Sequence, residues 1–242
     1  MQGIFYTVRT KSKGTVLVAL ALAMFNFAHA QNIKFEGSEF EVSNVKASVI
    51  DFRGEKVMKV ERDLNKLAFD PQRLEATVDE PTFLKLKDLD LENGTIEVKV
   101  YSQIQDPSPF QFAQGFIGLA YHIKEDNSAF ESIYLRPKVG RSDNQAFRNK
   151  TVQYFSYPDY KFERLRKEAP GKYETSAPVD IEEWISLRIE LKDEKAYLFV
   201  NDAAYSTFVV NKRLGKEKKG SVALWVDIGT IGYFKDLRIT KK

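Results

Sequence analysis

The sequence predicts an all-β fold in which two antiparallel sheets pack into a β-sandwich or close into a barrel. About ten to thirteen short segments rich in β-branched and aromatic residues recur at spacings of roughly ten residues. Apolar and polar residues alternate in many of them, and no long stretch has the periodicity of an amphipathic helix. Strands that are this short and this regularly spaced are typical of sandwiches and barrels.

The first thirty residues have the pattern of a secretory signal. Arg9, Lys11 and Lys13 precede an apolar run over 16–25, and Ala28-His29-Ala30 places small residues at the two positions that a signal peptidase reads. About ten apolar residues are too few for a membrane span. We therefore expect cleavage before Gln31, a secreted or periplasmic protein of bacterial type, and a single domain over 31–242.

Composition limits the partners of this domain. The chain has 37 Lys+Arg, 34 Asp+Glu and no cysteine. The only charges in the first thirty residues are three basic ones, so cleavage leaves a net charge near zero. A sustained positive patch, which binding to nucleic acid or an anionic membrane requires, is therefore not expected. Without cysteine there is no disulfide framework, and the fold must be stabilised by its core. The oligomeric state stays open.

Several strands and turns can be assigned along the chain. The segment 49–60 reads as two strands around Arg53-Gly54-Glu55, and 63–74 as a loop with a short helix. Asn93-Gly94 follows a leucine-rich alternation and precedes another alternating run, which predicts a hairpin. The nearly continuous apolar run 115–123 is typical of a central strand covered on both faces.

The carboxyl-terminal third continues this pattern. Residues 184–191 and 195–200 predict a hairpin through Lys192-Asp193-Glu194. Further strands are predicted over 205–210, 220–226 and 231–239.

The stretch 130–160 is the candidate binding site. Two predicted strands, 130–136 and 151–157, flank a very polar loop, and together they mix aromatic rings with Arg, Asn, Gln and Asp. Rings that stack on C–H faces and side chains that bond hydroxyls are what saccharide recognition requires. The predicted binding residues are Tyr134, Arg136, Arg141, Asp143, Asn144, Arg148, Asn149, Gln153, Tyr154, Tyr157 and Tyr160. The alternative is that the rings close the edge of the sandwich and the arginines form surface ion pairs with Glu131, Asp143 or Glu163.

Glu131 is the candidate catalytic carboxylate. Its neighbours Ile133 and Leu135 predict partial burial, which would raise its pKa into the range of a general acid/base. A salt bridge to an arginine of the same stretch is the alternative. Asp88-Leu89-Asp90-Leu91-Glu92 has the i, i+2 spacing of a retaining glycosidase but reads better as the wet face of an outer strand. His122, the only histidine beyond residue 30, reads as a hydrogen-bonded core or rim residue.

No cofactor is expected from the sequence. A structural calcium ion near Asp126-Asn127 or Asp143-Asn144 is conceivable, although neither segment has the spacing of a complete calcium loop. The expected partner is a carbohydrate.

A family resemblance rests on segments that extend over about residues 91–239. They are Gly118-Leu-Ala-Tyr121, Phe130-Glu131, Tyr134-Leu-Arg-Pro137, Val152-Gln-Tyr154, Glu183-Trp184, Val200-Asn201, Gly220-Ser-Val-Ala-Leu224 and Tyr233-Phe-Lys-Asp-Leu237. With them the chain resembles secreted bacterial concanavalin A-like lectin/glucanase domains related to the 3-keto-disaccharide hydrolase domain, which is similar to glycoside hydrolase family 16. The resemblance implies a two-sheet jelly roll whose concave sheet carries the carbohydrate site, with Glu131 matching the acidic residue of the groove.

The chain departs from those hydrolases at three places. Trp184-Ile185 stands where they tend to have Trp-Asn, Asn201-Asp202 replaces an Asn-Gly turn, and Leu224-Trp225 replaces Leu-Gln. Two functions are therefore expected as alternatives: saccharide binding on the concave sheet, or cleavage of oligosaccharides or 3-keto-glycosides by Glu131. A third alternative is an adhesion module that recognises protein through an exposed apolar patch.

Overall fold

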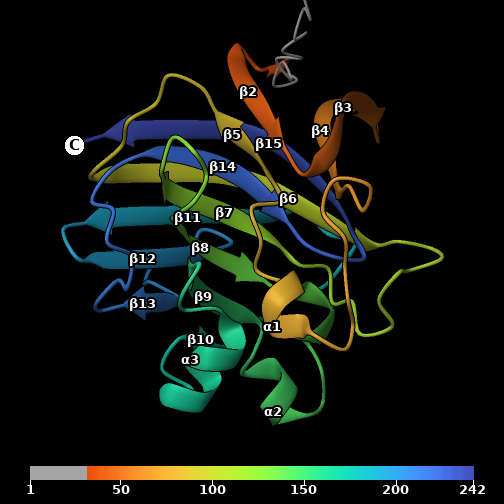
Figure 1. Ribbon diagram of the computed structural model, residues 1–242, viewed down its shortest axis with the longest axis vertical. Helices are drawn as coiled ribbons and strands as arrows, with labels where there is room; N and C mark the ends of the chain where they lie inside the picture. Colours follow the sequence, from red (N-terminus) through yellow and green to blue (C-terminus); the bar gives the residue numbers. More distant parts are fainter. Residues whose placement is uncertain (1–31) are drawn as a thin grey trace, which may run out of the picture.

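The computed structural model describes residues 32–242 (Figure 1). The predicted signal sequence and its cleavage site lie outside the described residues. Two antiparallel sheets make up the fold, which confirms the predicted β-sandwich. No helix in the described part of the chain is long and apolar enough to cross a bilayer.

The front sheet has eight strands in the order β1-β2-β5-β14-β7-β8-β9-β10. Their bounds are β1 Asn32–Phe35, β2 Ser38–Ser43, β5 Phe83–Leu86, β7 Ile117–Ile123, β8 Phe130–Leu135, β9 Val152–Tyr157, β10 Glu174–Thr175 and β14 Ser221–Val226. All seven residues of β7 are buried, so the prediction of a central strand covered on both faces is confirmed.

The back sheet has seven strands in the order β13-β12-β11-β6-β15-β4-β3. Their bounds are β3 Val45–Phe52, β4 Glu55–Arg62, β6 Gly94–Ile104, β11 Ile185–Lys192, β12 Lys195–Val200, β13 Phe208–Val210 and β15 Thr230–Lys241. The hairpins β3–β4 and β11–β12 are paired as predicted.

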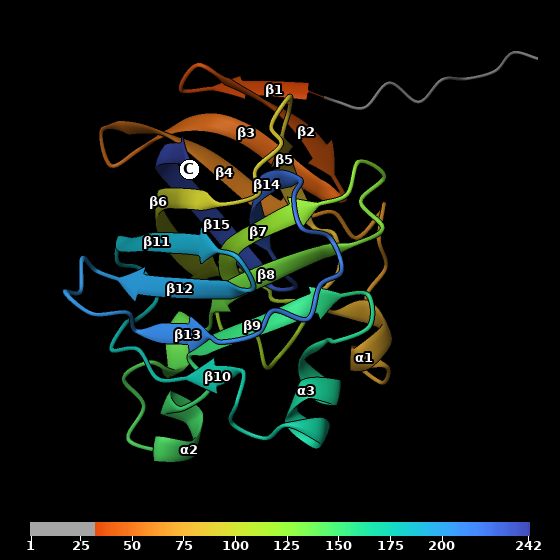
Figure 2. The same ribbon diagram turned by 90° about the vertical axis from the view of Figure 1, so that its left-hand side faces the viewer.

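Four short helices lie in the connections, and three of them gather in the lower half of Figures 1 and 2. Their bounds are α1 Leu74–Thr77, η1 Pro137–Val139, α2 Gln145–Arg148 and α3 Phe162–Glu168. A short helix was predicted within 63–74, but α1 begins at Leu74, the last residue of that segment, and extends beyond it. α3 was not anticipated, because its seven residues span only about two turns and show too little periodicity to be recognised.

The hairpin predicted at Asn93-Gly94 is wrong. The preceding strand β5 belongs to the front sheet, whereas β6, which begins at Gly94, belongs to the back sheet. The chain therefore crosses between sheets at this point. Gly94 has φ +156°, and a Cβ there would lie 2.3 Å from the Thr240 carbonyl oxygen, so close packing against β15 explains the glycine.

The two faces of the front sheet have different roles. Ile117 and Val226 lie directly opposite each other and approach Gly232 of the back sheet, which places them in the core between the sheets. Residues one position away point to the other, outer face. Phe83, Trp225, Gly118, Tyr134 and Gln153 are successive cross-strand partners and form a single row over this outer face.

Candidate functional site

The outer face of the front sheet carries a continuous group of aromatic rings. Tyr134 and Trp225 flank Gly118, which has no side chain, and their ring centroids are 4.9 Å apart. Phe155 contacts both rings, at 5.9 and 5.5 Å. A Cβ on Gly118 would come within 2.4 Å of the Ile133 carbonyl oxygen and 2.7 Å of Cβ of Tyr134, both on the neighbouring strand β8. The glycine therefore allows the rings to meet.

Two loops cover most of this face. The Trp225 indole donates to the Glu80 carbonyl oxygen at 2.9 Å, and the backbone N–H of Phe162 donates to Oδ2 of Asp79 at 2.8 Å. Lys161, at the start of α3, forms an ion pair with Glu80. The segment before β5 and the segment after β9 are thus held together across the sheet. As a result Trp225 is fully buried.

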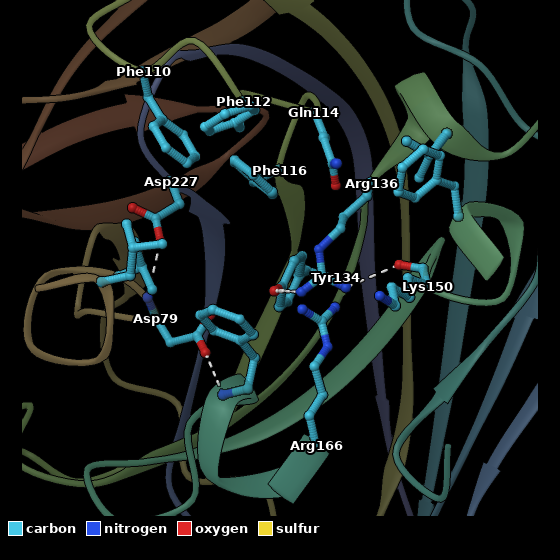
Figure 3. A pocket seen from close by; sticks show the side chains of 15 residues that line it. Asp79, Phe110, Phe112, Gln114, Phe116, Tyr134, Arg136, Lys150, Arg166 and Asp227 are labelled. Carbon is cyan, nitrogen blue, oxygen red and sulfur yellow. Dashed lines mark hydrogen bonds between the residues drawn. The ribbon is translucent and has the colours of Figure 1, made fainter. Parts of the chain in front are cut away.

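At one end of the cover the face opens into a cavity of about 280 Å³, which we name the aromatic–arginine pocket (Figure 3). Its aromatic lining consists of Phe110, Phe112, Phe116, Tyr134, Phe147 and Phe162. Its charged and amide lining consists of Asp79, Gln114, Arg136, Lys150, Arg166 and Asp227. Phe112 and Phe147 are 64% and 50% exposed, in contrast to the buried rings beneath them.

Arg136 is fixed at the base of the pocket. Nη1 donates to the Lys150 carbonyl oxygen at 2.9 Å, and Nη2 donates to the Tyr134 hydroxyl. The side-chain oxygen of Gln153 lies 3.4 Å from both Nη1 and Nη2. The guanidinium is also 4.8 Å from the centre of the Tyr134 ring. Arg136 is only 4% exposed, so its orientation is set by these contacts.

Two carboxylates approach the pocket from the covering side. Asp227 accepts from Arg62 Nη1 at 2.7 Å and from the backbone N–H of Asp79 at 2.9 Å. Asp79 is 1% exposed, and burial raises the pKa of its carboxyl to about 7, helped by the negative charge of Asp227 and opposed by the Phe162 N–H. At neutral pH Asp79 is therefore partly protonated and can either donate or accept a hydrogen bond.

The structure divides the residues predicted for one site between several places. Tyr134 and Arg136 line the aromatic–arginine pocket, and Gln153 supports Arg136 from below. Tyr157 and Tyr160 line a different cavity of about 250 Å³, at the other end of β8 and β9. Tyr154 is buried on the opposite face of the sheet, towards the core.

The polar loop 141–149 lies on the surface beside the pocket. Arg141 forms an ion pair with Glu183 at 2.8 Å, and Asn144 caps α2 by accepting from the Ala146 N–H. Arg148 donates to Gln145, Gln145 donates to Asn149, and Asp143 is exposed. Arg141 is thus in a surface ion pair, as the alternative expected, but its partner is Glu183 instead of Glu131, Asp143 or Glu163. Phe147 and Lys150 of the same region are the residues that reach the pocket.

Glu131 lies away from Arg136, on the core-facing side of β8. It is 1% exposed, accepts from Arg213 Nη1 at 2.8 Å and accepts from the Tyr154 hydroxyl. Burial acts to raise its pKa, but the His122 ring, whose Nδ1 lies 3.6 Å from the carboxylate, the charge of Arg213 and the bond from Tyr154 outweigh burial and lower it. The predicted rise of this pKa is wrong, and the salt-bridge alternative holds with Arg213 as the partner instead of an arginine of the 130–160 stretch.

His122 and the acidic segment 88–92 make contacts that stabilise the fold. Nε2 of His122 lies 2.9 Å from the Glu92 carbonyl oxygen, so Nε2 carries the hydrogen. Asp88 to Glu92 do not form a strand apart from a single bridge at Leu91, and Asp90 pairs with Lys219 at 2.6 Å. Asn127, one candidate calcium ligand, instead accepts from Lys85 at 2.8 Å. Within residues 32–242 no group of three or more His, Cys, Asp or Glu side chains is placed to hold a metal ion.

Comparisons with known proteins place the fold. No protein-family model matches the chain, and no curated protein sequence matches it. A carbohydrate-binding module from Bacillus subtilis, CBM66, is similar in structure with a TM-score of 0.50 and 12% identity, over 82% of this chain and 96% of the module. The chain therefore shares the two-sheet β-sandwich fold of this module.

Two further structures are similar with lower TM-scores. A β-glucanase of Bacillus licheniformis gives a TM-score of 0.45 at 10% identity, over 90% of this chain and 95% of the glucanase. A variant of human galectin-16 gives 0.40 at 12% identity, over 67% and 96%. At such identities the likeness concerns the fold alone.

Five pocket residues that sequence reasoning did not select are Asp79, Phe112, Gln114, Arg166 and Asp227. They come from four separate connections and converge only because those connections fold over the same sheet. One signal was available: the aromatic spacing of Phe110, Phe112 and Phe116 in a loop that is otherwise polar.

Proposed function

We propose that residues 31–242 act as one carbohydrate-binding domain and that the aromatic–arginine pocket holds the saccharide. The observation that carries the proposal is the combination of exposed rings with polar groups in one cavity. Phe112 and Phe147 remain accessible while the rings beneath them are buried, and Gln114, Lys150 and Arg166 lie in the same cavity. Rings bind the C–H faces of a sugar, and amide and cationic groups bind its hydroxyls.

The size of the pocket fits a small ligand. About 280 Å³ is near the lower end of the range for small-molecule sites, about 300–1,000 Å³. We therefore expect recognition of one end of a saccharide, with the rest of a longer chain in solvent. The fold shared with the Bacillus subtilis carbohydrate-binding module supports this class of function.

Substitution of the accessible rings tests the proposal. Binding of the protein to soluble polysaccharides is measured by affinity gel electrophoresis over a panel of neutral and acidic polymers, followed by calorimetry with oligosaccharides of the polymer retained. Phe112→Ala and Phe147→Ala each remove a stacking surface and are expected to weaken binding about tenfold. Tyr205→Ala is the matched control, since Tyr205 is an 87% exposed ring outside the pocket lining. Failure of the wild-type protein to bind any polymer of the panel would overturn the proposal.

The same binding measurement distinguishes the aromatic–arginine pocket from the cavity at the other end of β8 and β9. Tyr157→Ala and Tyr160→Ala alter the other cavity, and Arg141→Ala removes a surface ion pair. We expect these three variants to bind as the wild type does. Loss of binding in Tyr157→Ala or Tyr160→Ala, with binding intact in Phe112→Ala, would move the saccharide site to that cavity.

Cleavage of glycosides by Glu131 is less well supported by the geometry. Both carboxylate oxygens of Glu131 are engaged, by Tyr154 and by Arg213, and Gly215 lies against the carboxylate. Glu131 lines the cavity that Tyr157 and Tyr160 also line, but a general acid must offer a free carboxyl oxygen to the glycosidic oxygen. Release of products from oligosaccharides or 3-keto-glucosides that is lost in Glu131→Gln, in a variant that remains folded, would restore this candidate.

We also propose that the domain acts outside the cytoplasm, after removal of its first thirty residues. The basic start, short apolar run and Ala28-His29-Ala30 support this proposal. Amino-terminal sequencing of the protein exported by a bacterial host is expected to begin at Gln31.

A further inference from the structure

The aromatic–arginine pocket contains an excess of positive charge. Arg136 and Arg166 come from different elements, and their guanidinium groups face each other near the middle of the pocket (Figure 3). Both lie near the same counter-ion: Oε1 of Glu174 is 3.5 Å from Nη1 of Arg136 and 2.5 Å from Nη2 of Arg166. One carboxylate thus serves two guanidinium groups, and Lys150 adds a third cation.

The acidic residues of the pocket do not balance these cations. Asp227 forms an ion pair with Arg62, a buried arginine outside the pocket lining, and also accepts from two backbone N–H groups. Asp79 loses part of its charge near neutral pH because burial raises its pKa to about 7. The cations at the centre therefore lack a full set of counter-ions.

Several donors of the pocket are also unused. Among residues 32–242, no hydrogen bond involves Nε of Arg136, Nη1 of Arg166, Nζ of Lys150 or the side-chain amide of Gln114. In Figure 3 the Gln114 side chain points towards Arg136. Guanidinium groups prefer planar anions, which they bind with two parallel hydrogen bonds, over neutral hydroxyls.

We propose that the saccharide bound here is acidic, and that the carboxylate of a uronic acid residue sits between Arg136, Arg166 and Lys150 while its ring packs against Phe112 and Phe147. This inference rests on the proposed saccharide-binding function and names the class of sugar. A neutral sugar would leave the cations and their free donors without a partner in a partly dehydrated pocket, which is unfavourable.

Pairs of polymers that differ only in charge test the inference. Polygalacturonate, alginate and glucuronan are compared by affinity gel electrophoresis and calorimetry with their carboxyl-reduced forms, in which each carboxylate has become a primary alcohol. At least one acidic polymer is expected to bind at least tenfold more tightly than its reduced form, because charge-assisted hydrogen bonds are stronger than neutral ones. The affinity is also expected to fall with rising salt.

A matched pair of variants tests the position of the carboxylate. Lys150→Gln removes a half-buried charge from the pocket and is expected to weaken binding of the acidic polymer about tenfold, and binding of the reduced form much less. Lys218→Gln removes an exposed charge outside the pocket and is expected to have no effect. Circular dichroism and thermal unfolding establish that both variants are folded.

The outcomes separate the inference from the function on which it rests. Equal or tighter binding of the reduced or other neutral polymers would overturn the acidic ligand and leave saccharide binding intact. Equal binding of dextran sulfate would also overturn it, since the pocket would then recognise any polyanion. No binding of any acidic or neutral polymer would overturn the proposed function itself.

Discussion

The carboxylate of Glu131 lies 2.8 Å from Nη1 of Arg213, a residue 82 positions further along the chain. Their side chains are 1% and 8% exposed, so the pair is buried between the start of β8 and the segment after β13. When one partner of a buried ion pair is removed, water cannot take its place beside the remaining charge. This pair is therefore a structural contact on which the packing of residues 213–217 depends.

Glu131→Gln should destabilise the protein by about 3 kcal/mol, because it leaves the guanidinium of Arg213 buried and unpaired. The measurement is urea unfolding followed by fluorescence. Arg213→Met should have a similar cost, and the double variant should cost less than the sum of the two. Glu168→Gln, which breaks the exposed pair with Arg164, is the control and should change stability by less than about 0.5 kcal/mol. Additive effects of Glu131 and Arg213 would contradict a direct coupling.

Gly215→Ala should also destabilise the protein, since a Cβ at this position would lie 2.6 Å from Cδ of Glu131. Overpacking of this kind costs about 1–3 kcal/mol. The effect is measured by thermal unfolding beside Lys216→Ala, an exposed neighbour that should be nearly neutral. A Gly215→Ala protein as stable as the wild type would show that the 213–217 segment moves freely away from Glu131.

Asp79 should make the stability depend on pH. Its folded pKa, about 7, lies above the ordinary value of 3.8, so the folded state retains a proton that the unfolded state releases between these values. The contribution of Asp79 to the free energy of unfolding is therefore fully present below about pH 4. It is lost as the pH rises through about 7, and the loss is at most about 4 kcal/mol. The charged groups that face Asp79 are Asp227, Arg136 and Lys161.

Asp79→Asn is the matching variant, because the amide oxygen can still accept from the Phe162 N–H. Its unfolding midpoint should vary less between pH 5 and pH 8 than that of the wild type, and at pH 8 the variant should be the more stable protein. Thermal scans over this range provide the measurement. Identical pH profiles would mean that Asp79 is ionised throughout the range.

Gly118→Ala should disrupt the packing of the Tyr134 and Trp225 rings on the outer face of the front sheet. The added Cβ would lie within 2.4 Å of the Ile133 carbonyl oxygen and 2.5 Å of Cα of Tyr134, and backbone atoms cannot move aside without separating β7 from β8. We expect a loss of more than about 3 kcal/mol, measured by urea unfolding. Gly37→Ala, where a Cβ meets no atom within 4 Å, should cost less, and only through its positive φ of 77°. An equal cost at both positions would contradict the packing argument.

Much of the fold could be predicted because strands have a local signature. The period of two assigned β8 and β9 to within one residue. The predicted site nevertheless grouped Gln153 with Tyr154, which the structure places on opposite faces of the sheet. The turn at Arg53-Gly54 also follows from neighbouring residues alone, since both adopt positive φ, at 55° and 84°. Asn93-Gly94 has the same local signature but connects different sheets, so a dipeptide does not specify the partner of a strand.

The candidate site was predicted only in part. Tyr134 and Arg136 were identified from the mixture of rings and polar groups on one strand, and the structure places both in the aromatic–arginine pocket. Phe112, Asp79 and Arg166 were missed, because each belongs to a connection whose path over the sheet is not encoded by periodicity. A salt bridge of Glu131 was weighed with an arginine of the same stretch as partner, which is wrong, since its partner Arg213 lies 82 residues away.

The sequence by itself thus determined the strands and the alternation of their side chains, because these depend on backbone geometry over a few residues. Only the tertiary structure decided which strands share a sheet, which loops cover Trp225, and that Asp79, Phe112, Arg136 and Arg166 surround one cavity. Those arrangements depend on contacts between residues far apart in the chain, whose energies come from burial and charge pairing in the folded state.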